Sequence, residues 1–157
     1  MLLCIYSCSK KDSGTSSSSS TSGSNPQPTI TNFSVNGVAA NTPIPSSYTL
    51  GGNFIVGATD ATYSYPQLQL TFSGNMPPIS GPYTIVHTPT SPFYCSFSLI
   101  TATSSTITPT ITSTASSGIV NISATATPNN TASFSNILCT GTGTNTTTYT
   151  VSGTIKY

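Results

Sequence analysis

The sequence predicts an all-β protein: an antiparallel β-sandwich or barrel-like domain of about eight to ten short strands after a disordered N-terminal tether. Three observations support this prediction. The 157-residue chain is rich in Ser, Thr, Asn, Gly and Pro, which favour strands and turns over helices. Apolar residues alternate with polar ones in short segments bounded by turn residues. No stretch of about ten residues has a helical period.

The first candidate strands lie between residues 29 and 74. Their apolar residues, which alternate with polar neighbours, are Phe33 and Val35, Tyr48 and Leu50, Phe54 and Val56, and Leu68, Leu70 and Phe72. Between them, Asn36-Gly37 predicts a type I′ hairpin turn. Gly51-Gly52 predicts a bulge or bend in the chain.

Two further strands are predicted at sheet edges because proline cannot donate a backbone hydrogen bond. The first is the segment 80–87, which follows or contains Pro77, Pro78 and Pro82. The second surrounds Pro109, which is flanked by Ile107 and Ile111.

The C-terminal third continues the alternating pattern. Its apolar positions are Cys95, Phe97 and Leu99, then Val120, Ile122 and Ala124, then a segment that ends in Cys139, and finally Tyr149, Val151, Ile155 and Tyr157. This regular spacing of short strands is typical of a sandwich or a barrel-like domain.

The charge inventory excludes several classes of function. The chain has three Lys, two Asp, one His, no Arg and no Glu, and between Ser13 and Ile155 its only formal charge is Asp60. Nucleic-acid binding depends on clustered Lys and Arg, so a net charge of +1 argues against a nucleic-acid partner. Lys10 and Lys11 alone are too few for a polybasic membrane patch.

The N-terminal segment predicts a lipid anchor. Ile5-Tyr6-Ser7-Cys8 resembles a bacterial lipobox, in which an aliphatic residue and a small residue precede the cysteine that is acylated. Two or more acyl chains on Cys8 would anchor the protein, because each buried CH₂ contributes about 0.8 kcal/mol. Residues 1–7 lack a basic n-region, so we expect them to be the remnant of a truncated signal peptide. Residues 8–28 are then the lipidated cysteine with a Ser-rich, disordered tether, and 29–157 form the β-domain.

The start Cys8-Ser9-Lys10-Lys11-Asp12 and the Ser-rich run after it resemble small uncharacterised lipoproteins of the Bacteroidota. The segments "VNG", "GPYT", "SGIVNIS" and "YTVSGTIKY" are similar to segments of their β-rich domains. The resemblance implies that Lys10, Lys11 and Asp12 form a sorting signal for display on the outer face of the outer membrane, and that Ser9 is compatible with that destination. The resemblance implies a fold and a cellular location. It implies nothing about an activity, because these lipoproteins are uncharacterised.

The remaining cysteines could form a disulfide. Once Cys8 is acylated and Cys4 is removed, Cys95 and Cys139 remain, each on the apolar face of its segment. A bridge between them would stabilise the domain by about 3–5 kcal/mol on the chain-entropy model. The alternative is two buried free thiols. A metal site needs more soft or imidazole ligands than a chain with one His supplies, so we predict none.

The same inventory argues against catalysis. His87 and Asp60 could be combined with a Ser into a hydrolytic triad, but no Gly-x-Ser-x-Gly motif is present. A glycosidase needs two carboxylates, and Asp60 is the only one within the predicted domain. We expect His87 to be a loop residue and Asp60 to be a turn residue or, alternatively, a calcium ligand assisted by carbonyls. The sequence therefore predicts no catalytic residue and no cofactor.

Four tyrosines are expected to be exposed and are candidates for stacking on sugar rings: Tyr63, Tyr65, Tyr83 and Tyr94. Tyr63 and Tyr65 share one strand face, so they are the predicted ligand-stacking pair. The alternative is that these rings pack against a core edge or against Pro66.

Together these features predict a lipid-anchored outer-membrane or cell-surface protein with a structural, adhesion or accessory role and no enzymatic activity. Its expected partner is membrane lipid, through the acylated Cys8, and a protein or glycan partner is left open. The alternative function is a small-ligand or glycan-binding accessory lipoprotein.

Overall fold

The computed structural model describes residues 31–62, 65–102, 110–125, 129–144 and 146–157, and every regular element within these ranges is a strand. The strands are β1 (Asn32–Val35), β2 (Val38–Ala39), β3 (Ile44–Leu50), β4 (Asn53–Thr59), β5 (Gln67–Ser73), β6 (Gly81–Ile85), β7 (Tyr94–Ala102), β8 (Thr110–Ala115), β9 (Ile119–Ser123), β10 (Thr131–Gly141) and β11 (Thr148–Lys156). The all-β prediction is confirmed, although the eleven strands exceed the number expected.

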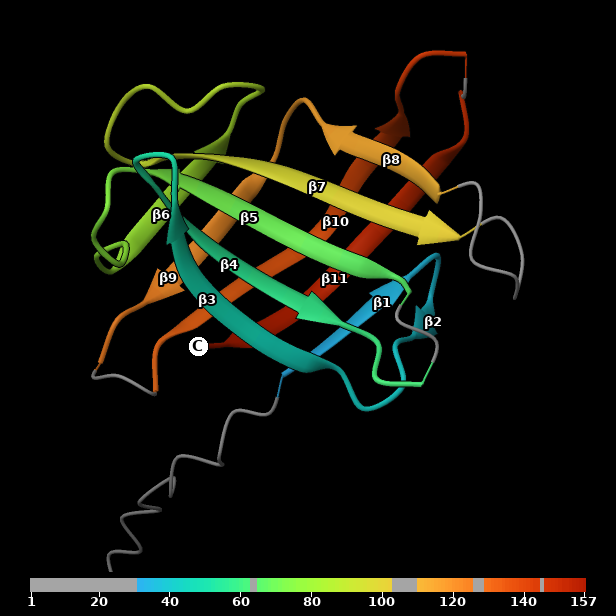
Figure 1. Ribbon diagram of the computed structural model, residues 1–157, viewed down its shortest axis with the longest axis horizontal. Helices are drawn as coiled ribbons and strands as arrows, with labels where there is room; N and C mark the ends of the chain where they lie inside the picture. The colour runs from blue at the N-terminus through green and yellow to red at the C-terminus, as the bar shows by residue number, and fades with distance from the viewer. Residues whose placement is uncertain (1–30, 63–64, 103–109, 126–128, 145) are drawn as a thin grey trace, which may run out of the picture.

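All eleven strands belong to one hydrogen-bonded sheet, in the order β2-β1-β11-β10-β9-β6-β7-β5-β4-β3, with β8 pairing both β10 and β7. Figure 1 shows that this sheet folds over on itself, so that β3, β4, β5 and β7 cross in front of β1, β11 and β10. The two layers pack their apolar sides together as a sandwich.

Two strands connect the layers because each of them changes partner along its length. β10 pairs with β9 over 131–134 and with β8 over 139–141. β7 pairs with β6 at 94–95 and with β8 over 98–102. These pairings close a ring through β10, β9, β6, β7 and β8 along one side of the sandwich.

A β-bulge in β10 accompanies its change of partner. The register with β11 shifts between Phe134 and Ile137. Asn136 lies in this interval with a φ of 53°, and its backbone N–H donates to the Ser152 hydroxyl at 2.8 Å. The bulge bends β10, so that its two halves can follow different neighbours.

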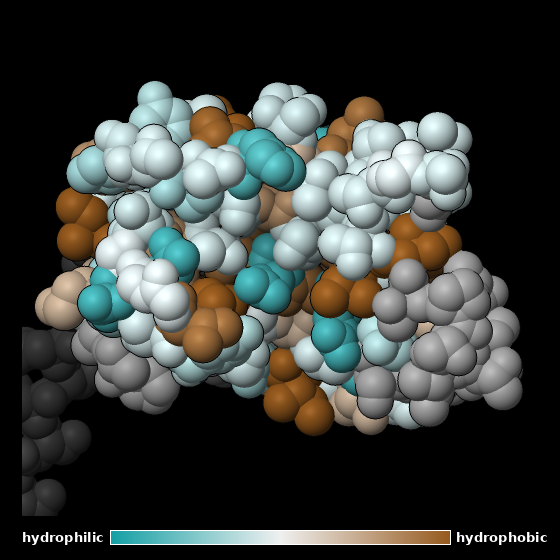
Figure 2. Space-filling view, turned by 45° about the horizontal axis from the view of Figure 1, so that its top comes forward, coloured by the Kyte–Doolittle hydropathy of each residue, from teal (hydrophilic) through white to brown (hydrophobic). Residues whose placement is uncertain are grey.

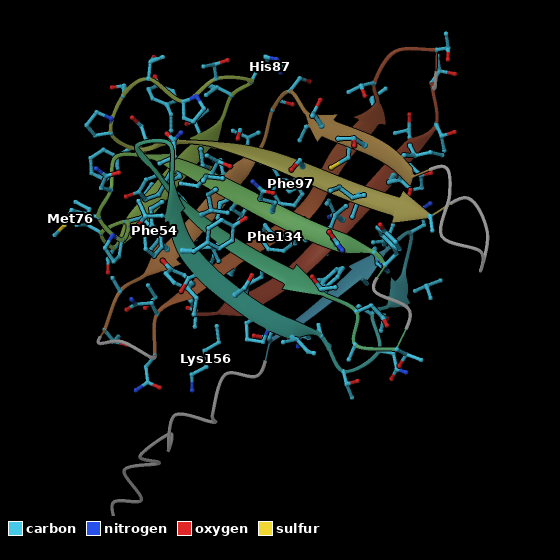
Figure 3. The ribbon with its side chains drawn as sticks, viewed as in Figure 1. Phe54, Met76, His87, Phe97, Phe134 and Lys156 are labelled. Carbon is cyan, nitrogen blue, oxygen red and sulfur yellow. The ribbon has the colours of Figure 1, made fainter. Side chains whose placement is uncertain are left out.

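The hydrophobic core fills the space between the layers. At its centre the rings of Phe97 in β7 and Phe134 in β10 meet edge to face, with centroids 5.1 Å apart (Figure 3). Alternation in β5, where Leu68, Leu70 and Phe72 are buried, is as predicted. Other fully buried side chains from both layers are Ile85, Leu99, Ile155, Val56, Val120 and Val151.

Both strands that were predicted at sheet edges lie inside the sheet, so this prediction is wrong. β6 lies between β9 and β7, and β8 lies between β7 and β10. β7 joins β6 only at Thr84 and Ile85, so Pro82 occupies a stretch of β6 that needs no donor toward β7. The β6–β7 pair is also parallel, whereas an antiparallel fold was expected. In β8, Ile111 is described, while Ile107 and Pro109 lie outside the described residues.

The predicted hairpin turn at Asn36-Gly37 is confirmed: it joins β1 to β2, and both residues have positive φ, of 51° and 79°. Gly51-Gly52 was predicted to form a bulge or bend. It forms instead the two-residue turn of the β3–β4 hairpin, with φ values of 58° and 81°.

Gly153 allows β1 to pack against β11. It faces Phe33 in β1 on one side and Phe134 in β10 on the other. A Cβ at this position would lie 2.6 Å from the Phe33 Cα and would also overlap the carbonyl oxygen of Asn32. Only glycine therefore fits between these two strands.

We expect Gly153→Ala to lower the free energy of unfolding by about 3 kcal/mol, because strand backbone cannot yield as a flexible side chain can. The control is Gly143→Ala, where the new Cβ would meet nothing within 4 Å and only the φ of 72° opposes it. That control should lose about 1 kcal/mol. Urea unfolding followed by circular dichroism measures both, and equal losses would contradict the predicted steric role.

Candidate ligand-binding site

A hollow of about 270 Å³ opens at one end of the sandwich. The loop 74–80, between β5 and β6, and the loop 86–93, between β6 and β7, form its walls together with the strand ends beside them. Its volume lies just below the range of roughly 300–1,000 Å³ that is usual for small-molecule sites. The apolar and aromatic residues that line it are Phe72, Met76, Pro77, Pro78, Ile79, Tyr83, Pro92, Phe93 and Tyr94.

Three aromatic rings run from the core to the rim of this hollow. Phe72 is buried and meets the Tyr83 ring edge to face at 5.1 Å. Tyr83 in turn packs against Phe93, with ring centroids 5.4 Å apart. Phe93 is 43% exposed, so the outermost ring of this series presents part of its surface to solvent. Its position depends on two further rings that are buried and ordered by the core.

Phe93 has an unusual backbone conformation. Its φ of 64° lies in the left-handed region, which a bulky side chain rarely adopts. The carbonyl of Phe93 accepts a hydrogen bond from the Thr84 N–H at 2.9 Å, which fixes this conformation. Gly81 lies beside the ring, and a Cβ there would meet it in ordinary van der Waals contact at 3.4 Å. Strained residues held in this way are frequent at binding sites.

The loop 74–80 is fixed at both ends. The N–H of Gly74 donates to the Gly52 carbonyl at 3.1 Å, which ties the loop to the β3–β4 turn. The Ser80 hydroxyl accepts a 2.8 Å hydrogen bond from the N–H of Ala124 just after β9. These contacts lie within the protein itself and hold the walls of the hollow in place, which lowers the entropic cost of binding.

Burial raises the pKa of the Tyr83 hydroxyl, so this group stays protonated at neutral pH. It donates to the Ile79 carbonyl at 3.3 Å and thereby braces the loop 74–80 from below. Met76 projects away from the sandwich at the same end (Figure 3) and is 78% exposed.

No charged side chain of the described residues lines the hollow. Among the described residues the formally charged side chains are Asp60 and Lys156, and both lie elsewhere. Figure 2 shows that most of the visible described surface has intermediate hydropathy, with separate apolar patches. The polar side chains at the hollow are Ser73, Asn75, Thr90 and Ser91. An ion would lose hydration there without gaining a countercharge, so the site suits an uncharged ligand.

Two of the four tyrosines named from the sequence line the hollow. Tyr94 is partly exposed at the rim, and Tyr83 is buried, so its predicted exposure is wrong. Tyr65 is half-buried in the β4–β5 connection, at the opposite end of β5 from the hollow, and Tyr63 lies outside the described residues. Their pairing as a stacking platform stays a prediction.

The sequence analysis missed Phe93. Strand periodicity cannot identify it, because it lies in a loop and its importance arises from contact with Tyr83. The available signal was the density of proline on both sides of the predicted strand 80–87: Pro77, Pro78, Pro89 and Pro92. Such segments are restricted in φ and form fixed loops.

The two candidate polar residues have separate roles. His87 is an exposed residue of the loop after β6, as expected (Figure 3). Asp60 is buried, and its carboxylate accepts hydrogen bonds from the backbone N–H groups of Asn41, at 2.6 Å, and Thr62, at 2.8 Å. Asp60 is therefore the turn residue that was predicted, and it also ties the β2–β3 connection to the β4–β5 connection.

The predicted disulfide is wrong, and the alternative of two free thiols holds: Cys95 and Cys139 are both free and buried. The topology explains this, because Cys95 is aligned with residues of β5 and β6, whereas Cys139 is aligned with residues of β8 and β11. Each thiol fills its own place in the core as a small apolar group. Burial raises the pKa of each to about 12.

The proposed lipidation residue Cys8, the sorting signal at Ser9, Lys10, Lys11 and Asp12, and the tether lie outside the described residues. The described part of the chain has no helix long and apolar enough to cross a membrane. It also has no group of three or more His, Cys, Asp or Glu side chains that could hold a metal ion.

Comparisons with protein-family models, with curated proteins and with solved structures gave no match for this chain. The candidate site is therefore defined by its own geometry.

The buried thiols predict a specific loss of stability at alkaline pH. The unfolded chain ionises Cys95 and Cys139 near their ordinary pKa of 9.0, whereas the folded chain keeps both protons until about pH 12. The free energy of unfolding should be insensitive to these groups below pH 9. Above it, the stability should fall by up to about 1.4 kcal/mol per pH unit for each thiol.

Between pH 9 and 10 the loss of stability comes mainly from the two thiols. Tyr83 and Tyr157 have ordinary pKa values of 10.0, so in the unfolded chain they ionise mainly above this interval. The control is the double variant Cys95→Ala, Cys139→Ala, which should remove the decline in that interval. Identical pH profiles for the two proteins, or a peptide map in which Cys95 and Cys139 are cross-linked, would refute the assignment.

Proposed function

We propose that this protein is a lipid-anchored surface module that binds an uncharged, glycan-type ligand in the aromatic hollow and carries out no catalysis. The observation that carries the ligand-binding part is the ring series Phe72, Tyr83 and Phe93, which begins in the core and ends at a solvent-facing ring. The electron-rich face of an aromatic ring attracts the polarised C–H groups of a sugar. Hydroxyl and amide side chains beside the ring can bind the sugar hydroxyls.

The anchoring part of the proposal rests on the sequence before the domain. The lipobox-like Ile5–Cys8 segment and the Ser-rich run that follows it support attachment of the chain to an outer membrane through acyl chains on Cys8. The described chain enters the sandwich at β1, near the bottom of Figure 1, whereas the loops that form the hollow lie at its left and upper left. A domain held by its N-terminus would thus leave the hollow accessible beside the bilayer.

The absence of catalysis in the proposal rests on composition. Proton transfer and nucleophilic attack require titratable groups placed together, and the whole chain has one His, two Asp and no Glu. His87 is exposed in a loop, while the Asp60 carboxylate is occupied by backbone N–H groups in a different connection. A binding role needs none of these groups.

A structural or adhesive coat is the competing function. Its support is the Ser- and Thr-rich surface, which is hydrated without charge and would suit a passive covering layer. Such a coat would not require a preorganised aromatic hollow, so the geometry favours ligand binding as an accessory function at the cell surface.

The ligand test uses the full-length chain on an array of neutral and acidic glycans, followed by calorimetry with the neutral glycans that bind. Phe93→Ala and Tyr94→Ala should each weaken binding by about tenfold, because each removes an aromatic ring at the rim against which a sugar can pack. Tyr48→Ala is the control, since Tyr48 is exposed on β3 and does not line the hollow. Binding that is unchanged in both rim variants, or no binding of any glycan, would leave the coat function as the better explanation.

The anchor test compares Cys8→Ser with Cys4→Ser, each expressed from the native gene in its own host, using detergent phase separation. The native protein and Cys4→Ser should enter the detergent phase, whereas Cys8→Ser should enter the aqueous phase because it cannot be acylated. Mass spectrometry of the native N-terminus should find Cys8 as the first residue with its acyl chains. A native protein with an unmodified Cys8 still preceded by Ser7 would contradict the anchor.

A further inference from the structure

The strand β3 forms an open edge of the sheet. It pairs with β4 on one side, and no strand of the described residues lies on its other side. All seven of its residues are exposed, those that point toward the opposite layer included. The opposite layer therefore does not cover β3, and both faces of the strand are accessible to an incoming chain.

The hairpin register shows which backbone groups point outward. Leu50 and Asn53 close the two-residue Gly51-Gly52 turn, and such a closing pair exchanges hydrogen bonds. Alternation then directs the backbone groups of Leu50, Tyr48, Ser46 and Ile44 toward β4. The backbone groups of the intervening residues Pro45, Ser47 and Thr49 point toward the free edge.

Pro45 occupies an outward position, where the N–H that it lacks is not needed for pairing with β4. Ser47 and Thr49 have outward-facing backbone donors. The seven residue pairs between β3 and β4 follow one another without a bulge, and no residue of β3 is charged. Natural edge strands are usually shielded by charge, bulges, proline or short length, and of these devices β3 has only Pro45 near one end. The other end of the same sheet illustrates short length, because β2 has only two residues.

The sequence of β3 is self-complementary about Ser47. In a two-fold antiparallel pair, Ser47 would face Ser47 of a second copy, Ile44 would face Leu50, and Ser46 would face Tyr48. The two Ser47 residues would exchange two hydrogen bonds, and Thr49 of each copy would donate to the Pro45 carbonyl of the other. On one face, the apolar Ile44, Tyr48 and Leu50 of both copies would form a continuous row.

The self-complementary sequence of β3 favours a second copy as the occupant, and the described charges do not oppose it. The described formal side-chain charges, Asp60 and Lys156, are opposite in sign and lie outside β3, so two copies of the domain would approach without net repulsion. We propose that β3 is a self-association edge, through which two copies of this chain join their sheets by antiparallel β3–β3 pairing. This goes beyond ligand binding, and it leaves the hollow free because β3 contributes no residue to its lining.

The test combines sedimentation equilibrium with hydrogen–deuterium exchange on the full-length chain, from micromolar to millimolar concentration. The native chain should form dimers, and the Ser47 and Thr49 amides should become protected as the concentration rises. Ser47→Pro should weaken the dimer by at least about tenfold, because it removes the central donor without removing a bond to β4. The control Thr49→Val retains every backbone donor and should dimerise like the native chain.

Several results would overturn the proposal. One is a native chain that stays monomeric with both amides unprotected at every concentration. Another is a dimer that Ser47→Pro does not weaken, which would place the interface elsewhere. Protection that does not depend on concentration would show that another segment of the same chain covers β3. If Ser47→Pro does not fold, as judged by circular dichroism, the concentration dependence of amide protection in the native chain decides alone.

Discussion

The contact between Phe97 and Phe134 is the interaction on which the rest of the sandwich depends. The two rings meet edge to face at 5.1 Å, one from each layer. Phe97 lies between the part of β7 that pairs with β6 and the part that pairs with β8, and Phe134 is the last residue of β10 that pairs with β9. The layers are thus packed together at the place where both strands exchange neighbours.

This arrangement explains why a chain with so few charges can form a defined structure. Within the part of the chain that the structure describes, its specificity comes from aromatic contacts, close glycine packing at Gly153 and backbone hydrogen bonds. The ring of paired strands fixes β6 between β7 and β9. Because β6 carries Tyr83, the same constraint holds the ring series that supports Phe93 at the hollow. The strand pairing that orders the core therefore also positions the aromatic rings at the hollow.

Local structure could be predicted from the sequence where short-range physics decides it. Alternation in β5 and the Asn36-Gly37 turn are examples, because burial of every second residue and positive φ leave direct traces in composition. The same holds for Asp60, whose short carboxylate bonds the backbone two residues later.

Long-range relations could not be predicted in the same way. Prolines in and before β6 indicated an edge, but the strand is internal because β7 begins to pair only beyond Pro82. The predicted disulfide was wrong because the alternating pattern shows only that both cysteine side chains point inward. It does not show which strands Cys95 and Cys139 lie beside. Phe93 gained its role from a tertiary contact with Tyr83, which no local pattern encodes.

The claim that the hollow at the loops 74–80 and 86–93 binds an uncharged sugar is tested most directly by nuclear magnetic resonance. Amide and aromatic signals of the full-length chain would be followed during titration with a neutral oligosaccharide and with its sulfated counterpart. Binding should shift the Tyr83 and Phe93 ring signals and the amides of both loops with the neutral sugar alone. Shifts confined to another face, or equal responses to the sulfated sugar, would contradict it.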